Sequence, residues 1–211
     1  MAIKYIDQAD FKDKKVIARF DFNVPLSGAP LTIDDTTRID LAIPTIRKIL
    51  TGGAKKLVMM SHLGRPKAGK DKRFSLEPVA SYLAERLHEE ILLTESATDS
   101  AIKTMLGLST NRIILLENLR FHPQEKANDP EFARTLASYA DIYVNDAFGT
   151  CHRKHASTYG INTYFPQDAY GGMLLAREVT ALAKVVERPQ MPLVAILGGA
   201  KVQDKIKIIE K

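Results

Sequence analysis

The strongest constraint on the fold of this chain is an alternation of short apolar runs with stretches of helical periodicity. Five runs are short enough to be buried strands, at residues 15–20, 56–60, 90–93, 111–116 and 142–144. Apolar residues recur at helical spacing after residues 35–37, 75–78 and 129–130. Strands that alternate with helices form βαβ units with parallel strands. We therefore predict an α/β fold, with a doubly wound, mostly parallel sheet and helices on both faces in three Rossmann-like layers.

The pattern changes after residue 170. Gly171 and Gly172 lead into a long predicted helix, which ends at Pro189 because proline cannot continue a helix. A new apolar strand follows at 193–197, and one strand with the start of a helix cannot bury a core alone. We therefore expect three segments, namely a first domain at 1–170, an interdomain helix and hinge at 171–192, and the start of a truncated second α/β domain at 193–211.

Composition narrows the class of protein. The chain has 211 residues and a net charge of +5, but no block of five basic residues, so we expect no nucleic-acid partner. The single cysteine rules out an intrachain disulfide and fits a reducing compartment. The start of the chain lacks a signal-peptide pattern, and no apolar run is long enough to span a bilayer. We expect a cytoplasmic protein with no membrane partner.

Charged and amide side chains follow four of the predicted strands, and one further charged side chain lies in the first turn of a predicted helix. They are Asp21, Asn23, Arg38, His62, Arg65, Arg120 and Arg153. Each alone is compatible with an ordinary solvated surface residue, but the carboxyl ends of strands in an open sheet meet at one crevice. The arginine fork matches the oxygens of carboxylates and phosphates. We predict a site for a small molecule that carries both groups, with Asp21 and Asn23 accepting from a hydroxyl or orienting the arginines.

A glycine-rich segment, 198–205, follows the last predicted strand. Glycines allow backbone N–H groups to approach a phosphate, and Lys201 and Lys205 are spaced to share one helix face. The segment lacks the spacing of a P-loop. A simple turn with ordinary surface lysines fits the spacing equally well.

The cluster of Cys151, His152 and His155 suggests two further chemistries. The three residues lack the second ligand pair of a zinc site, and no third member completes a thiol-nucleophile triad. We therefore predict no metal site here, and expect the histidines to position groups around the anion site.

Six motifs in order resemble the phosphoglycerate kinase family, and together they cover essentially the whole chain. They are Arg19–Pro25, Arg38 with Pro44–Ile46, Ser61–Pro66, Leu116–Phe121, Asn145–Thr150 with His152–Ser157, and Gly198–Val202 with Asp204 and Lys205. The resemblance implies two doubly wound α/β domains around a cleft, the first binding 3-phosphoglycerate and the second MgATP or MgADP. It also implies a monomer. Cys151 and Lys154 stand where the family more often has small residues, which makes a reactive Cys151 beside the site conceivable.

The resemblance assigns roles to individual residues. The substrate-binding set it implies is Asp21, Asn23, Arg38, His62, Leu63, Gly64, Arg65, Arg120 and Arg153. The nucleotide-binding set it implies is Gly199, Ala200, Lys201 and Lys205. Arg38 and Lys201 are the expected catalytic residues, which stabilise the phosphoryl group in transit. The aspartate that holds the nucleotide and its Mg²⁺ lies in a part of the family's second domain that this sequence does not include.

The implied reaction is reversible phosphoryl transfer between ATP and the carboxylate of 3-phosphoglycerate, giving 1,3-bisphosphoglycerate and ADP, with hinge closure of two domains. As the substrate-binding half, this chain is expected to be inactive alone. A non-catalytic anion-binding module is the main alternative, and it predicts binding without an ATP-dependent product. Nucleic-acid binding by the basic surface ranks last, because the cations gather at strand ends.

Overall fold

A computed structural model describes residues 3–67, 71–108, 110–187 and 194. The chain separates into two compact units, Met1–Glu178 and Val179–Lys211. The first unit contains the whole sheet and all of the residues predicted to bind the acid substrate.

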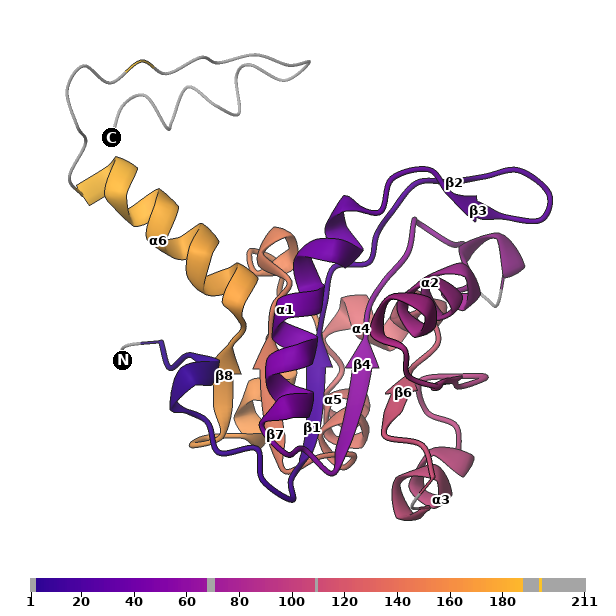
Figure 1. Ribbon diagram of the computed structural model, residues 1–211, viewed down its shortest axis with the longest axis horizontal. Helices are drawn as coiled ribbons and strands as arrows, with labels where there is room; N and C mark the ends of the chain where they lie inside the picture. The colour runs from indigo at the N-terminus through magenta and orange to yellow at the C-terminus, as the bar shows by residue number, and fades with distance from the viewer. Residues whose placement is uncertain (1–2, 68–70, 109, 188–193, 195–211) are drawn as a thin grey trace. The chain divides into compact units, whose positions relative to one another are not determined.

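A six-stranded parallel sheet forms the centre of the first unit (Figure 1). In chain order its strands are β1 (Lys15–Arg19), β4 (Lys56–Met60), β5 (Ile91–Leu93), β6 (Ile113–Leu115), β7 (Ile142–Asn145) and β8 (Ala169–Gly171). In space their order is β5-β6-β4-β1-β7-β8, and each neighbouring pair is parallel. The five strands predicted before residue 170 are confirmed, with ends that differ by up to two residues. The sixth predicted strand, at 193–197, lies outside the described residues except for residue 194. Strand β8 was not predicted.

Helices cover both faces of the sheet, as predicted. Alternate residues of β1 show this, because Val16 and Ala18 belong to one apolar core and Ile17 to another. The first core includes the apolar faces of α1 (Thr37–Thr51) and α2 (Glu77–Leu87). The second includes those of α3 (Ala101–Gly107) and α5 (Pro130–Ala137). Strands buried on both faces need nearly continuous apolar sequences, which is why the centres of the runs are apolar and do not alternate with polar residues.

Local signals in the sequence explain several helix ends. The α5 helix begins at Pro130 because the Asp129 side chain accepts a hydrogen bond from the Phe132 N–H, a standard N-cap. It ends at Ala137. The α1 helix ends at Thr51, and Gly52 follows it as the C-cap. The predicted long helix is α6 (Met173–Glu187), and its predicted end at 188–189 lies outside the described residues.

Short elements were not predicted from periodicity, since few residues cannot show a period. They include the antiparallel pair β2 (Leu26–Ser27) and β3 (Thr32–Ile33), and the helix α4 (Pro123–Ala127). Five 3₁₀ turns were also missed, at Ile6–Gln8, Lys72–Phe74, Leu119–Phe121, Phe148–Thr150 and Gly160–Tyr164. Within the described residues, no helix combines the length and apolar character that crossing a membrane requires.

The direction of winding reverses at β1. The chain passes from β1 to β4 on one side, and later from β6 to β7 on the other side of β1. The connecting helices α1 and α5 lie on opposite faces, and such a reversal leaves a crevice at the carboxyl edge of the sheet. A pocket lined in part by Asp21, Arg38 and Asp146 lies at this edge. The crevice is where α/β sheets of this type bind ligands.

Candidate functional site

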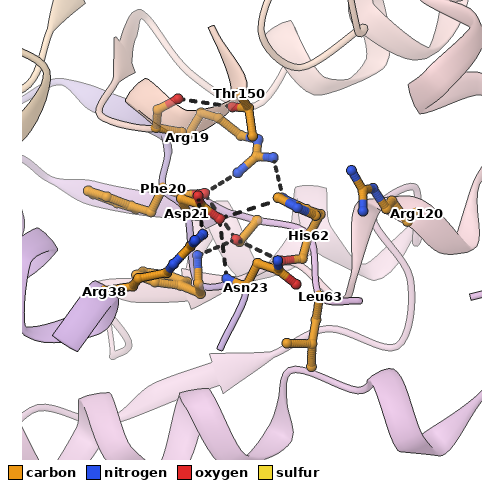
Figure 2. Close-up of polar contacts among 12 residues, drawn as sticks. Arg19, Phe20, Asp21, Asn23, Arg38, His62, Leu63, Arg120 and Thr150 are labelled. Carbon is orange, nitrogen blue, oxygen red and sulfur yellow. Dashed lines mark hydrogen bonds and ion pairs between the residues drawn. The ribbon is translucent and has the colours of Figure 1, made fainter. Parts of the chain in front are cut away.

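The loops that follow β1 and β4 are tied together by Asp21 and Asn23 (Figure 2). Asp21 Oδ2 accepts a hydrogen bond from Arg38 Nη1 at 2.6 Å, so the first turn of α1 is joined to the end of β1. Asn23 Oδ1 accepts from the Gly64 backbone N–H at 2.7 Å. The Arg38 side chain remains 53% exposed, so its other donors are available to a ligand.

His62 is buried beside these groups and is neutral. Its Nδ1 lies 2.9 Å from Arg19 Nη2 and 3.9 Å from Asp21 Oδ1. Burial, followed by the positive charges of Arg19, Arg120 and Arg153, lowers the pKa of His62 from 6.5 to about 2. The positive charge of the predicted site at neutral pH therefore comes from its arginines and not from His62.

The loop after β6 is positioned by Asn118, a residue that the sequence did not single out. Its Oδ1 accepts from the backbone N–H groups of Leu63 and Arg120, and its Nδ2 donates to the carbonyls of Leu63 and Phe74. Arg120 is nearly buried, and its Nη1 donates to the Gly64 carbonyl at 2.5 Å. Its Nε has no hydrogen-bond partner among the described residues. Arg120 is thus held firmly, with donor capacity left over.

Gly64 needs the conformational freedom of glycine. Its φ is +59°, and a Cβ at this position would lie 2.4 Å from the Phe74 ring. A side chain here would be strained and would also displace the ring. Glycine therefore allows the carbonyl of residue 64 to meet Arg120 while its N–H meets Asn23.

Arg65 and Arg153 complete the predicted set at the rim of the crevice. Both side chains are exposed. The charge of each acts on Arg120 and lowers its pKa, after the larger effect of burial. Arg65 and Arg153 thus add positive charge around Arg120, an arrangement that suits a ligand with several negative charges.

A buried polar network behind the crevice was missed from the sequence. The guanidinium of Arg19 donates from Nε to Ser157 Oγ at 3.1 Å and from Nη1 to the Phe20 carbonyl. Glu125 accepts from the Ser157 hydroxyl at 2.6 Å and from the Ser157 N–H at 3.0 Å. The visible signal was an arginine inside an apolar run; nothing local marked Glu125 in α4.

Two sets of requirements bear on the described residues, those of a metal site and those of a reactive thiol. The described part of the chain contains no group of three histidine, cysteine or acidic residues that could hold a metal ion. Burial raises the pKa of the Cys151 thiol, which disfavours the nucleophilic thiolate. The predicted nucleotide-binding residues, Gly199, Ala200, Lys201 and Lys205, lie outside the described residues.

Acid is expected to destabilise the fold through its buried histidines. The folded-state pKa is about 2 for His62 and about 4 for His155, both lowered mainly by burial. The unfolded chain binds protons below an ordinary histidine pKa of 6.5, whereas the folded chain does not, so stability falls as pH falls through 6.5. From about pH 7.5 to about pH 5.5, His62 alone should account for about 1 kcal/mol.

Urea unfolding at the two pH values tests this expectation. The His62→Gln variant should lose less stability on acidification than the unmodified chain, and a variant of the exposed His88 should behave like the unmodified chain. An equal loss in His62→Gln and the unmodified chain would show that His62 titrates alike in the folded and unfolded states.

Fold and site together define a class of protein. It is an α/β protein with a doubly wound parallel sheet, whose crevice at the carboxyl edge is lined by arginines and by acceptors that hold them. The family profile for phosphoglycerate kinase matches residues 6–211. The chain therefore belongs to the phosphoglycerate kinase family, and it corresponds to the N-terminal half of that family's proteins.

Individual relatives agree with the family assignment. The chain is 47% identical over 211 residues to phosphoglycerate kinase of Chlorobium luteolum, covering all of this chain and 52% of that protein. It is 46% identical over 207 residues to the chloroplastic enzyme of Volvox carteri, covering 98% of this chain and 44% of that protein. The chain thus spans about half the length of the curated relatives it matches.

Solved structures show the same fold. Phosphoglycerate kinase from Coxiella burnetii is similar with a TM-score of 0.85 and 39% identity, over 99% of this chain and 51% of that one. The enzyme from Pyrococcus horikoshii gives a TM-score of 0.85 and 29% identity, over 99% and 52%. The predicted doubly wound fold of the first domain is confirmed.

Proposed function

We propose that this chain is the 3-phosphoglycerate-binding half of a phosphoglycerate kinase. The observation that carries the proposal is the charge of Arg65 and Arg153 acting on Arg120, whose loop is tied through Gly64 to Asn23, beside Asp21 and its partner Arg38. A ligand with a carboxylate, a hydroxyl and a phosphate matches that set, because arginines bind both anions and Asp21 or Asn23 accepts from the hydroxyl. Members of the family to which the chain belongs are named for this substrate.

The proposed reaction transfers the γ-phosphoryl group of ATP reversibly to the carboxylate of 3-phosphoglycerate. A carboxylate is already ionised at neutral pH, so the nucleophile needs no general base. Catalysis then depends on positioning and on stabilising charge. Arg38, with Lys201, would stabilise the moving phosphoryl group, because it lies at the start of α1 with donors exposed. Arg65, Arg120 and Arg153 would hold the phosphate of the substrate, assisted by His62.

The nucleotide is proposed to bind outside the arginine-lined crevice, at a second site of the full-length protein. Gly199, Ala200, Lys201 and Lys205 are our candidates for contacts with its phosphates. Mg²⁺ would arrive with the nucleotide and neutralise phosphate charge; the described residues include no set that could hold it, so its protein ligands are sought elsewhere. We further propose that 171–192 is a hinge between a domain of residues 1–170 and one that begins at 193, and that closure brings the two ligands together.

Calorimetric titration of 3-phosphoglycerate into the 211-residue chain tests the substrate site. Saturable binding is expected, weakened roughly tenfold to a hundredfold in Arg38→Ala and in Arg65→Ala, because each removes hydrogen bonds to an ionised group. Arg47→Ala is the matched control, since Arg47 is an arginine of the same helix as Arg38 but donates to the Arg86 carbonyl away from the crevice. It should bind within about twofold of the unmodified chain. No binding by a folded chain would contradict the proposal.

Turnover separates the kinase from a non-catalytic anion-binding module. The full-length protein with MgATP and 3-phosphoglycerate should form 1,3-bisphosphoglycerate, whereas the 211-residue chain alone should bind the acid and form no product. Binding by both without product from either would favour the anion-binding module.

A further inference from the structure

Arg19 is a buried cation whose donors are directed at other protein groups. It is the last residue of β1 and is only 1% exposed. Its Nε donates to Ser157 Oγ. Its Nη1 donates to the Phe20 carbonyl and its Nη2 to His62 Nδ1 (Figure 2). Because each guanidinium nitrogen already donates to a protein group, Arg19 is not suited to bind a ligand. Its effect on the site is through its contact with His62.

The contact with His62 determines which ring nitrogen carries the proton. Arginine nitrogens donate and cannot accept, and Arg19 Nη2 lies 2.9 Å from His62 Nδ1. Nδ1 must therefore accept, which requires its lone pair. A neutral imidazole whose Nδ1 accepts carries its proton on Nε2.

The other groups around His62 agree with this protonation state. The pKa of His62 is lowered electrostatically by Arg120, Arg153 and His155 as well as by Arg19. A positive charge on the His62 ring would be repelled by these arginines. The carboxylate of Asp21 is 3.9 Å from Nδ1, beyond hydrogen-bond distance, and it already accepts from Arg38. Within the part of the chain that the structure describes, no acid lies within hydrogen-bond distance of Nδ1.

A directed chain of hydrogen bonds holds Arg19 in turn. The Ser157 hydroxyl donates to Glu125 Oε1 at 2.6 Å, so its oxygen is free to accept from Arg19 Nε. Glu125 is 1% exposed, and its negative charge offsets the buried guanidinium. The orientation of His62 thus rests on Glu125, Ser157 and Arg19 in sequence.

We infer that Arg19 is a positioning residue that holds His62 as the neutral Nε2–H tautomer, so that His62 serves the site as a one-directional hydrogen-bond donor to an anionic oxygen. The inference rests on the proposed function only for the identity of that anion. His62 then selects for a ligand oxygen with a free lone pair, and the charge of the ligand is matched by the arginines alone.

Long-range ¹H–¹⁵N correlation spectra of the ¹⁵N-labelled, ligand-free chain at neutral pH test the tautomer directly. The His62 signals are assigned by their loss in His62→Gln. The expected pattern is that of a neutral ring with one protonated nitrogen, Nε2. A proton on Nδ1, or on both nitrogens, would overturn the inference whether or not the chain binds 3-phosphoglycerate.

The Arg19→Met variant tests the positioning role. The Nδ1–H tautomer should become detectable, and 3-phosphoglycerate should bind roughly tenfold more weakly, because the donor is no longer held toward the ligand. Arg134→Met, which removes an exposed arginine of α5 remote from His62, should change neither reading. If Arg19→Met does not fold, the double variant Arg19→Met with Glu125→Gln removes both buried charges and is read in the same way. An unchanged tautomer and affinity in the folded variant would refute the role of Arg19.

Discussion

Replacement of Glu125 by alanine is expected to lower the free energy of unfolding by about 3–5 kcal/mol, the cost of leaving one partner of a buried charge pair uncompensated. Glu125 is 1% exposed and accepts from both the N–H and the hydroxyl of Ser157. Its charge is the largest of those that oppose the lowering of the Arg19 pKa by burial. Alanine would leave Arg19 without that charge and two donors of Ser157 without an acceptor.

Urea unfolding followed by far-UV circular dichroism measures the effect, since the chain contains no tryptophan. Glu131→Ala is the matched control, because it removes a glutamate that is 70% exposed and paired with Arg134 on the same helix. Its cost should stay below about 1 kcal/mol. Glu125→Gln, which keeps the shape and an acceptor oxygen, should fall between the two. A loss below about 1 kcal/mol in Glu125→Ala would show that Glu125 does not stabilise Arg19.

Much of the fold was predictable from the sequence because it depends on local pattern. The runs at 57–60 and 142–144 carry no charged residue, as is typical of strands covered on both faces. Strand β8 was missed since Ala169–Gly171 is short and contains a glycine, and only its pairing with β7 makes it a strand. Its signal is tertiary, and no window of sequence around it contains the partner.

The candidate site was also predictable only in part. Arg38, Asp21 and Arg120 could be predicted to meet, because the position of a loop at a strand end follows from the order of the elements. The charge state of His62 could not, since it depends on burial and on neighbours from other loops. Glu125 could not either, because its partner Ser157 is 32 residues away in the sequence. What the sequence concealed is the set of groups that orient the candidate site, and not the set that we propose to face the ligand.

Replacement of Gly172 by alanine is the second change with a large expected effect, a loss of about 3–5 kcal/mol in the free energy of unfolding. An added Cβ would lie 2.2 Å from Asp146 Oδ1 and 2.6 Å from Asp146 Cβ. The carboxylate cannot easily move, because it is 1% exposed and accepts from the Leu175 N–H at the start of α6. The backbone is also held, since the Gly172 N–H donates to the Asn145 carbonyl and the Met173 N–H to Thr45 Oγ1. Either the start of α6 shifts or a buried carboxylate loses its donor.

One further variant serves as a control for the added methyl group, and another tests whether the clash with Asp146 causes the loss of stability. Gly107→Ala adds the same methyl group at a helical glycine whose Cβ would meet no atom within 4 Å, so its stability should be unchanged or higher by up to about 1 kcal/mol. Asp146→Gly removes all three of the Asp146 atoms that lie within 2.6 Å of the added methyl group, at its own cost because Leu175 loses an acceptor. If the clash is the cause, the Asp146→Gly and Gly172→Ala double variant should be more stable than the sum of the single losses by about 1–3 kcal/mol. Additive losses would show instead that Gly172 is required for its backbone and not for the space it leaves to Asp146.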